Sequence, residues 1–443
     1  MGQRNGTRAV ASGILMLVLA GCMNGGNADD GIVSRFKAGP LGTEATGKRT
    51  EKRTGEKQES VIIATLQERR SVLPSGSSFD KVAGPVLSAN ARAAESELRS
   101  ARLRAEAQSK NWLPTLGPNI SLSSLGDLVA TMVIDAVLFD NGRKKAEREF
   151  ARADVEVAAV NLAIDSNDRV YTALELYLRA QQARETATHL EASLKDMRHF
   201  EWVMNERVKG GVSDMSDLHV IRHKLSKIQA DLSAQNELAA SAMAELNAMS
   251  VKKLNGIGGL SDIRVTRHDA QALTVLLAEA EKERSITGAK IDRAGHLPGL
   301  GATATLAKGG NVTAGLATRM DTPFGFGTKA SLQAIEAEKE AAGRRVNQAQ
   351  EDANRSLAKA ETRLAALSRQ VGESSNLSAQ AKSNLDLFQT QYDAGQRQVM
   401  DVVGVYETWS VQEQSRIGLK YDMALTRLDM ARELGLLADG GDI

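Results

Sequence analysis

Residues that could perform chemistry are few in this 443-residue chain, and their spacing does not group them into a catalytic set. His219 and His223 are four residues apart and follow Asp217, so on a helix they could share one face and bind a metal ion. No third strong ligand stands nearby in the sequence, and a solvent-facing histidine pair is the simpler interpretation. No Ser-His-Asp or Cys-His set can be assembled either. We therefore expect neither a metal site nor an enzyme.

The only cysteine, Cys22, stands where a covalent lipid would be attached. An apolar run over residues 10–20 follows two arginines and ends in Leu19-Ala20-Gly21-Cys22, which resembles the lipobox of bacterial lipoproteins. The resemblance implies that residues 1–21 are a signal peptide and that the Cys22 thiol carries a diacylglyceryl group. Met23, in place of the aspartate typical of inner-membrane lipoproteins, favours the outer membrane. The alternative is an ordinary signal peptide with an incidental cysteine.

The composition indicates a helical protein that does not bind nucleic acid. The net charge is only +1, whereas binding to phosphates needs a basic surface. Aromatic residues make up 4%, and alanine and leucine are mixed with Glu, Lys, Arg and Gln, as in long helices and coiled coils. Residues 22–75 are polar and predict a flexible tether. Within it, residues 42–48 approach a phosphate-binding loop, but Arg49 replaces the magnesium-binding Ser or Thr, so we regard the match as chance.

The remainder of the chain contains one sequence unit twice. Leu113-Pro114 recurs 184 residues later as Leu297-Pro298. In a second motif, Gly211 recurs at the same distance of 184 residues as Gly395. We assign a first repeat to residues 76–250, a linker to 251–269 and a second repeat to 270–443.

Each unit predicts a helix followed by two strands. Helices over about 79–111 and about 270–295 end at the Leu-Pro pairs, because proline does not continue a helix. Alternating apolar and polar residues then predict two short strands per unit, with tight turns at Gly126-Asp127 and Gly309-Gly310. One apolar and one polar face per strand is the pattern of a membrane β-barrel.

A very long helix and a shorter return helix complete each unit. In the second unit, apolar and small residues step by four and three from Ala353 to Tyr392, which is a heptad repeat. A helix over about 327–392 would be roughly 100 Å long. Glycines at 210–211 and 395 predict turns, after which helices return over about 214–249 and 398–437.

These motifs resemble the TolC-type outer-membrane efflux protein family over roughly residues 75–437. The matching segments are LPTLGP with VLFDNGRKKA near the strands, and ERVKGGVSDMSDL with QYDAGQRQVMDVV at the helical turns. The resemblance implies a mainly α homotrimer with a small β part. Long antiparallel helical hairpins would form an α-barrel across the periplasm, and two β-hairpins per subunit would contribute to a membrane β-barrel of twelve strands. It also implies a passive exit duct of an efflux or type I secretion system, with a periplasmic adaptor protein and an inner-membrane pump as partners.

The resemblance further implies roles for polar residues at the helical turns. Tyr392 and Arg397 would bond to Ser216 and Asp217 and hold the periplasmic end closed. Asp401 would point into the lumen. The turn glycines Gly210, Gly211 and Gly395 would mark the mouth where the adaptor docks. The alternative is that these residues only cap helices and shape the turns.

Two charges interrupt the uncharged strands. Asp135 and Arg319 lie 184 residues apart, at equivalent places in the two predicted hairpins. A charge on the lipid face is costly, so we expect both to face the pore. A position at the periplasmic rim is the open alternative.

Two classes of function compete. The first is a trimeric, lipid-anchored outer-membrane channel that extends into the periplasm. The second is a lipid-anchored coiled-coil spacer without a pore. The two strand pairs favour the channel, because a spacer has no use for alternating hairpins at equivalent points of both repeats.

Overall fold

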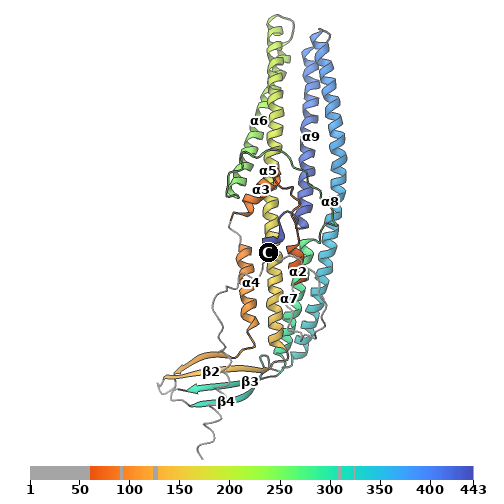
Figure 1. Ribbon diagram of the computed structural model, residues 1–443. Helices are drawn as coiled ribbons and strands as arrows, with labels where there is room; N and C mark the ends of the chain where they lie inside the picture. The colour runs from red at the N-terminus through yellow and green to blue at the C-terminus, as the bar shows by residue number, and fades with distance from the viewer. Residues whose placement is uncertain (1–59, 90–92, 123–127, 308–310, 324, 443) are drawn as a thin grey trace, which may run out of the picture. The chain divides into compact units, whose positions relative to one another are not determined.

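The computed structural model describes residues 60–89, 93–122, 128–307, 311–323 and 325–442, and residues 58–443 form one compact unit. This part of the chain is mostly helical, with one small sheet (Figure 1). Its helices are α2 (Val61–Gln67), α3 (Ser78–Leu87), α4 (Ala93–Ser109), α5 (Arg143–Lys209), α6 (Met215–Ala248), α7 (Leu273–Gly295), α8 (Thr328–Asp393), α9 (Val399–Glu433) and the short 3₁₀ helix η2 (Gly440–Asp442). Its strands are β1 (Thr115–Leu122), β2 (Leu128–Phe139), β3 (Gly299–Ala307) and β4 (Val312–Arg319).

The predicted first helix over 79–111 is wrong, because the structure has two helices there, α3 and α4. The hydroxyl of Ser88, the residue that follows α3, donates to the carbonyl of Gly84 at 2.8 Å. Such side-chain bonds compete with a continuing helix. Phe79 and Val82 of α3 are fully buried, so this helix packs into the core.

The tether predicted over 22–75 is also too long. Its last part contains α2, whose first turn is capped by the Ser60 hydroxyl, and Leu66 of this helix is fully buried. Arg69 is buried as well and donates to the carbonyl oxygens of Leu434 and Gln271 at 2.6 and 2.7 Å. Burial lowers the pKa of Arg69 to about 10. This stretch is therefore fixed to the end of the chain and to the segment before α7.

The segment between the two repeats, predicted as a linker over 251–269, is packed rather than loose. Leu254, Ile263 and Val265 are buried in the central apolar cluster. The Tyr177 hydroxyl of α5 donates to the Gly259 carbonyl at 2.7 Å. The core therefore lies where this segment meets α3, α5 and α9.

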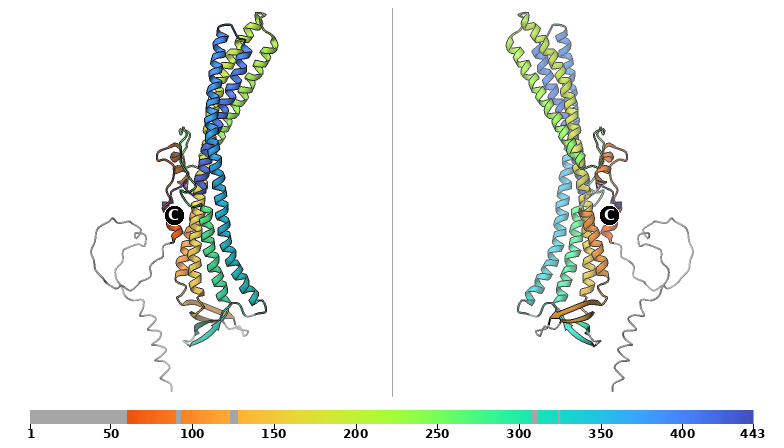
Figure 2. Two further views of the ribbon diagram at one scale, coloured as in Figure 1. Left: turned by 90° about the vertical axis from the view of Figure 1, so that its right-hand side faces the viewer. Right: turned by 90° about the vertical axis from the view of Figure 1, so that its left-hand side faces the viewer.

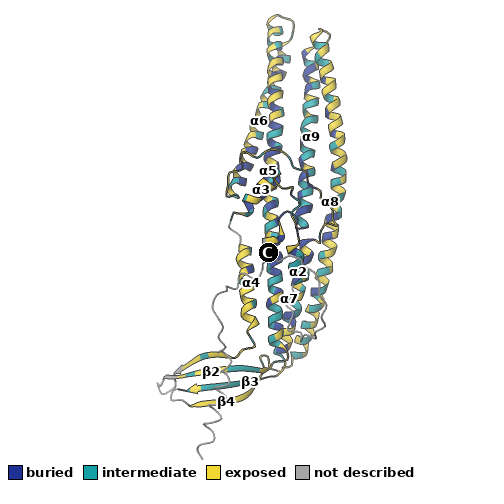
Figure 3. Ribbon diagram, viewed as in Figure 1, coloured by how far each residue is buried: buried dark blue, intermediate teal, exposed yellow. Residues whose placement is uncertain are grey.

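The long helices pack as a row. Near the strands α4 packs on α5, α5 on α7 and α7 on α8, whereas farther away α6 packs on α5, α5 on α9 and α9 on α8 (Figures 1 and 2). α5 has 67 residues, so at 1.5 Å per residue it is about 100 Å long. The turns after α5 and α8 therefore lie far from the strands. At the edges of the row, most of α6 and α8 is exposed (Figure 3).

The heptad seam predicted in α8 is confirmed. Every predicted seam position is buried or half-buried, and most residues between them are exposed. Small residues such as Ser374 and Ser378 let α8 approach its neighbour closely, and both are buried. The seam positions are Ala353, Leu357, Ala360, Leu364, Leu367, Val371, Ser374, Ser378, Ala381, Leu385, Phe388 and Tyr392.

Several predictions fall outside the described residues. These are the signal peptide over 1–21, the lipid site Cys22, the loop at 42–48 and the strand turns Gly126-Asp127 and Gly309-Gly310. Among the helices that the structure describes, none is both long and apolar enough to cross a membrane.

Candidate functional site

The four strands form an antiparallel sheet in the order β1-β2-β3-β4, which leaves β1 and β4 as edges. Leu116 of β1 pairs with Ile134 of β2, and Met132 of β2 pairs with Leu306 of β3. Directly paired residues point to the same face of a sheet. Although Val133 and Val137 of β2 lie on the other face, the register places eight large apolar side chains from all four strands together on one face. They are Leu116, Ile120, Met132, Ile134, Leu300, Leu306, Val312 and Leu316.

This apolar face is exposed in the single chain. Leu116 is 65% exposed and Leu316 is 70% exposed, and the other large side chains of this face are exposed too. An exposed apolar surface that continues across four strands marks a contact with lipid or with another protein. The opposite face carries mainly threonine and glycine, with Val133 and Val137 of β2 among them, together with both charges of the strands.

Both charges predicted to share one environment lie together on that polar face. Asp135 of β2 accepts a hydrogen bond from the Thr303 hydroxyl of β3 at 2.7 Å. The Arg319 guanidinium of β4 lies 3.6 Å from the same carboxylate oxygen. The sheet therefore joins residues that are 184 positions apart in the sequence.

The two helical turns have the same backbone geometry. Gly211 and Gly395 have φ angles of +74° and +75°, a region that side chains other than glycine rarely adopt. The amide after each glycine donates back into the preceding helix, Val212 to Arg207 at 2.9 Å and Gln396 to Gln391 at 2.8 Å. These bonds are those of a Schellman motif.

The other residues predicted at the turns take part in local contacts. Gly210 adopts a right-handed conformation, and Ala394 occupies the equivalent place after α8, so glycine is not required there. Asp401 accepts from the Gln398 amide at 3.3 Å in a capping box that begins α9. The Ser216 amide donates to Asp214, which caps α6.

The predicted latch is not formed within one chain. Arg397 donates to the Gln391 side chain at 3.0 Å and lies over the Phe388 ring at 4.4 Å. No hydrogen bond or ion pair joins it or Tyr392 to Ser216 or Asp217 in the described part of the chain. The latch is therefore absent from the described single chain, and its role in an assembled duct stays a prediction.

We call α5 with α6 the first hairpin, and α8 with α9 the second. Below the turns, an apolar cluster includes residues of all four helices, among them Phe200 and Val402. The Tyr406 hydroxyl of α9 donates to Asp196 of α5 at 2.9 Å. Lys224 of α6 also forms an ion pair with Glu407 of α9. These contacts join the two hairpins just below the turns.

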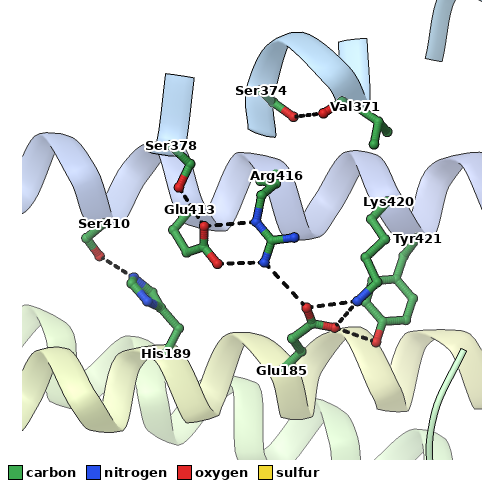
Figure 4. Close-up of polar contacts among 10 residues, drawn as sticks. All are labelled: Glu185, His189, Val371, Ser374, Ser378, Ser410, Glu413, Arg416, Lys420 and Tyr421. Atoms are coloured by element: carbon green, nitrogen blue, oxygen red, sulfur yellow. Dashed lines mark hydrogen bonds and ion pairs between the residues drawn. The ribbon is translucent and has the colours of Figure 1, made fainter. Parts of the chain in front are cut away.

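A larger polar network joins the hairpins nearer their middle (Figure 4). Glu185 of α5 accepts hydrogen bonds from Lys420 at 2.8 Å and from the Tyr421 hydroxyl at 2.8 Å. Arg416 lies 3.8 Å from the same carboxylate and binds Glu413 through two hydrogen bonds. Since Lys420, Tyr421 and Arg416 all belong to α9, Glu185 ties the first hairpin to the second.

The same network reaches α8, and a separate contact between α5 and α9 lies beside it. Glu413 accepts from the Ser378 hydroxyl of α8 at 2.6 Å, and His189 of α5 shares a hydrogen bond with Ser410 at 2.9 Å (Figure 4). The hydrogen bond from Arg416 is the main reason that the pKa of Glu413 is lowered to about 2, so its carboxylate is charged. Burial lowers the pKa of His189, which favours the neutral ring.

Sequence reasoning missed this network because its partners are distant in the chain. Glu185 and Tyr421 are 236 residues apart, and neither departs from the pattern of an ordinary helix. The available signal was the spacing of Glu413, Arg416 and Lys420, three and four residues apart, just before Tyr421.

The two histidines considered as metal ligands lie on α6 and are exposed, with Asp217 half-buried beside them. Within the residues that the structure describes, no three acidic, histidine or cysteine side chains are placed to hold a metal ion.

Comparisons with known proteins show similarity in structure but not in sequence. No protein-family model and no curated protein matches the chain. A membrane protein from Pseudomonas aeruginosa has a TM-score of 0.72 with it at 15% identity, over 90% of this chain and 98% of that one. The open state of the MtrE outer membrane channel of Neisseria gonorrhoeae scores 0.67 at 16% identity, over 91% and 99%. The outer membrane protein VceC from Vibrio cholerae scores 0.66 at 14% identity, over 84% and 95%.

These solved structures match nearly their whole length, and they include outer-membrane channels. This chain therefore has the fold of the TolC-type outer-membrane efflux channels.

Proposed function

We propose that this chain forms a homotrimeric exit duct through the outer membrane and across the periplasm, and that solutes pass through it without chemical change. The exposed apolar face of the sheet carries the proposal. Its eight large side chains lie in register across four strands, opposite a face that carries most of the strands' threonines and both of their charges. A membrane barrel needs this division, with lipid outside and water inside.

Closure into a ring follows from the edges. β1 and β4 each pair on one side only, and unpaired backbone groups cannot remain exposed to lipid. The row of helices has matching edges, with α4 and α6 on one side and α8 on the other. If copies of the chain were arranged head to tail around an axis, the same rotation would bring β4 of one copy beside β1 of the next, and α8 of one copy beside α4 and α6 of the next. Three copies of four strands would give the twelve-stranded barrel that the family resemblance implies.

Membrane attachment would be reinforced by lipid on Cys22. The strands have 8, 12, 9 and 8 residues, whereas a tilted membrane strand needs roughly 9–11. A covalent lipid would add an anchor beside this short barrel. We expect Cys22→Ser to leave the chain unprocessed or released from the outer membrane, and an unmodified Cys22 in the mature wild-type chain would contradict the lipid site.

The turns at Gly211 and Gly395 would form the periplasmic mouth. They lie at the far end of helices about 100 Å long, where an adaptor protein and an inner-membrane pump of an efflux or type I secretion system would meet the duct. Tyr392 and Arg397 would hold this end closed through contacts that form on assembly. Asp401 from each subunit would place a carboxylate at the constriction.

The second candidate is a lipid-anchored spacer without a pore. The long hairpins alone would suit a spacer equally well. A spacer in water, however, would leave the apolar face of the sheet exposed at a cost. The exposed face therefore favours the duct.

Conductance across planar lipid bilayers tests the proposal. We expect the purified, lipidated trimer to give discrete conductance steps. The neighbouring residues Ile134 and Val133 offer matched variants, because they lie on opposite faces of β2. Ile134→Glu places a charge on the lipid face and should prevent insertion, whereas Val133→Glu should insert and conduct. A correctly folded Tyr392→Phe, Arg397→Ala variant, in which the proposed closure is removed, would refute the duct if it inserted without conducting.

A further inference from the structure

All the charge of the described strands belongs to one pair of residues. Among the residues of β1 to β4, only Asp135 and Arg319 are ionisable. They carry opposite charges and lie 3.6 Å apart on the polar face. The strands therefore contribute no net charge to that face.

The geometry of the pair explains how residues on β2 and β4 meet across β3. Asp135 pairs with Thr303, and Arg319 pairs with Gly299, so the arginine starts four residues away along β3. On the polar face of β3, the Arg319 side chain passes over Gly299 and Gly301 to reach Asp135, and these glycines have no side chains to block it. Thr303 orients the carboxylate through its hydrogen bond of 2.7 Å.

The pair remains open to water. The Arg319 side chain is 64% exposed and that of Asp135 is 35% exposed. An exposed ion pair contributes little to stability. Its main physical effect is on the electrostatic potential beside the sheet, because each charge cancels the other's field.

We propose that Asp135 and Arg319 are specificity-determining residues that keep the membrane part of the duct electrically neutral, so that it admits solutes of either charge. This inference rests on the proposed function, in which the polar face lines the pore. Loss of either partner would leave one uncompensated charge per subunit. Asp135→Asn would make the lumen positive there, and Arg319→Gln would make it negative.

The rates at which charged thiol reagents modify a cysteine in the barrel measure this potential directly. Thr305→Cys places the thiol on the polar face, two residues beyond Thr303 on β3, without removing a member of the pair. Anionic sulfonatoethyl and cationic trimethylammonioethyl methanethiosulfonates would be added at low ionic strength outside proteoliposomes. This readout does not depend on the state of the helical turns, because the reagents enter from the membrane end.

The expected shifts follow from Coulomb's law. One unit charge about 10 Å away in water changes the local concentration of a monovalent reagent about twofold, so the anionic-to-cationic rate ratio should change about fourfold. Asp135→Asn should raise this ratio, Arg319→Gln should lower it, and the double variant should return it close to that of Thr305→Cys alone. An unchanged ratio in both single variants would overturn the proposal.

A second cysteine separates this inference from the proposed function. Leu306→Cys lies next to Thr305 but on the apolar face. If the sheet faces lipid there, this thiol should react far more slowly with both reagents. Equal reaction at both positions would contradict the membrane barrel itself, whereas slow reaction at 306 with unchanged ratios at 305 would contradict only the role of the charge pair. Circular dichroism would verify that each variant is folded.

Discussion

Glu185 is the residue whose replacement should loosen the contact between the two hairpins most clearly. Its carboxylate accepts from Lys420 and Tyr421 and lies near Arg416, all on α9. Glu185→Gln keeps the shape and can still accept from Tyr421, but it removes the charge that attracts the two cations.

The magnitude follows from the number and exposure of these bonds. A hydrogen bond to a charged group contributes about 1.5–3 kcal/mol. The Glu185 and Lys420 side chains are 29% and 31% exposed, so solvent screening places the loss toward the low end. We expect a loss of about 1–2 kcal/mol, which is a factor of about 5–30 in the equilibrium for local opening.

Amide hydrogen exchange of α9 measured by mass spectrometry reports this opening. The segment around residues 413–424 should exchange about 5–30 times faster in Glu185→Gln than in wild type. Glu175→Gln is the matched control, because Glu175 of α5 pairs with Arg179 on the same helix and does not bridge the hairpins. Wild-type exchange of this segment in a folded Glu185→Gln variant would refute the assignment.

Three further predictions concern the second hairpin. The pKa of Glu413 is lowered from 4.5 to about 2 in the folded protein, so its contribution to stability is present above pH 4.5 and is lost as the pH falls toward 2. The melting temperature should therefore fall less between pH 4.5 and pH 2 in Glu413→Gln than in wild type. Equal falls in both proteins would contradict the pairing of Glu413 with Arg416. Gly395→Ala should destabilise the folded protein by roughly 1–2 kcal/mol because residue 395 has a positive φ. Gly404→Ala, inside α9 and facing open space, should be neutral or stabilising. Thermal unfolding compares the two variants, and similar effects would rule out backbone strain at Gly395. The double variant Tyr392→Phe, Arg397→Ala should raise single-channel conductance while the trimer persists, and Asp401→Ala should reduce the preference of the channel for cations. If the double variant conducts like the wild-type protein, Tyr392 and Arg397 only shape the turn.

Local patterns in the sequence predicted the elements that repeat regularly. The heptad seam of α8 predicted its buried face, because a helix places every third or fourth residue on one side. The alternation in the strands predicted two faces, and the register adds that these faces match across all four strands. The turn glycines were found because positive φ favours glycine.

Contacts between distant segments could not be predicted in this way. The packing of α2 against the end of the chain depends on Arg69 meeting carbonyl groups more than 200 residues away. The Glu185 network likewise joins helices whose sequences are each unremarkable. The latch assigned to the turns came from family resemblance alone, and within the described chain Arg397 binds Gln391 instead.

The most direct test of the account is an accessibility scan of β2 in lipid bilayers. Spin labels would be attached to single cysteines at positions 130–137 of the otherwise unchanged chain. We expect collisions with oxygen, which dissolves in lipid, to dominate at positions 130, 132, 134 and 136. Collisions with a water-soluble nickel complex should dominate at positions 131, 133, 135 and 137. This alternation would place lipid on one face and water on the other, whereas uniform accessibility to nickel would contradict a membrane barrel and with it the proposed duct.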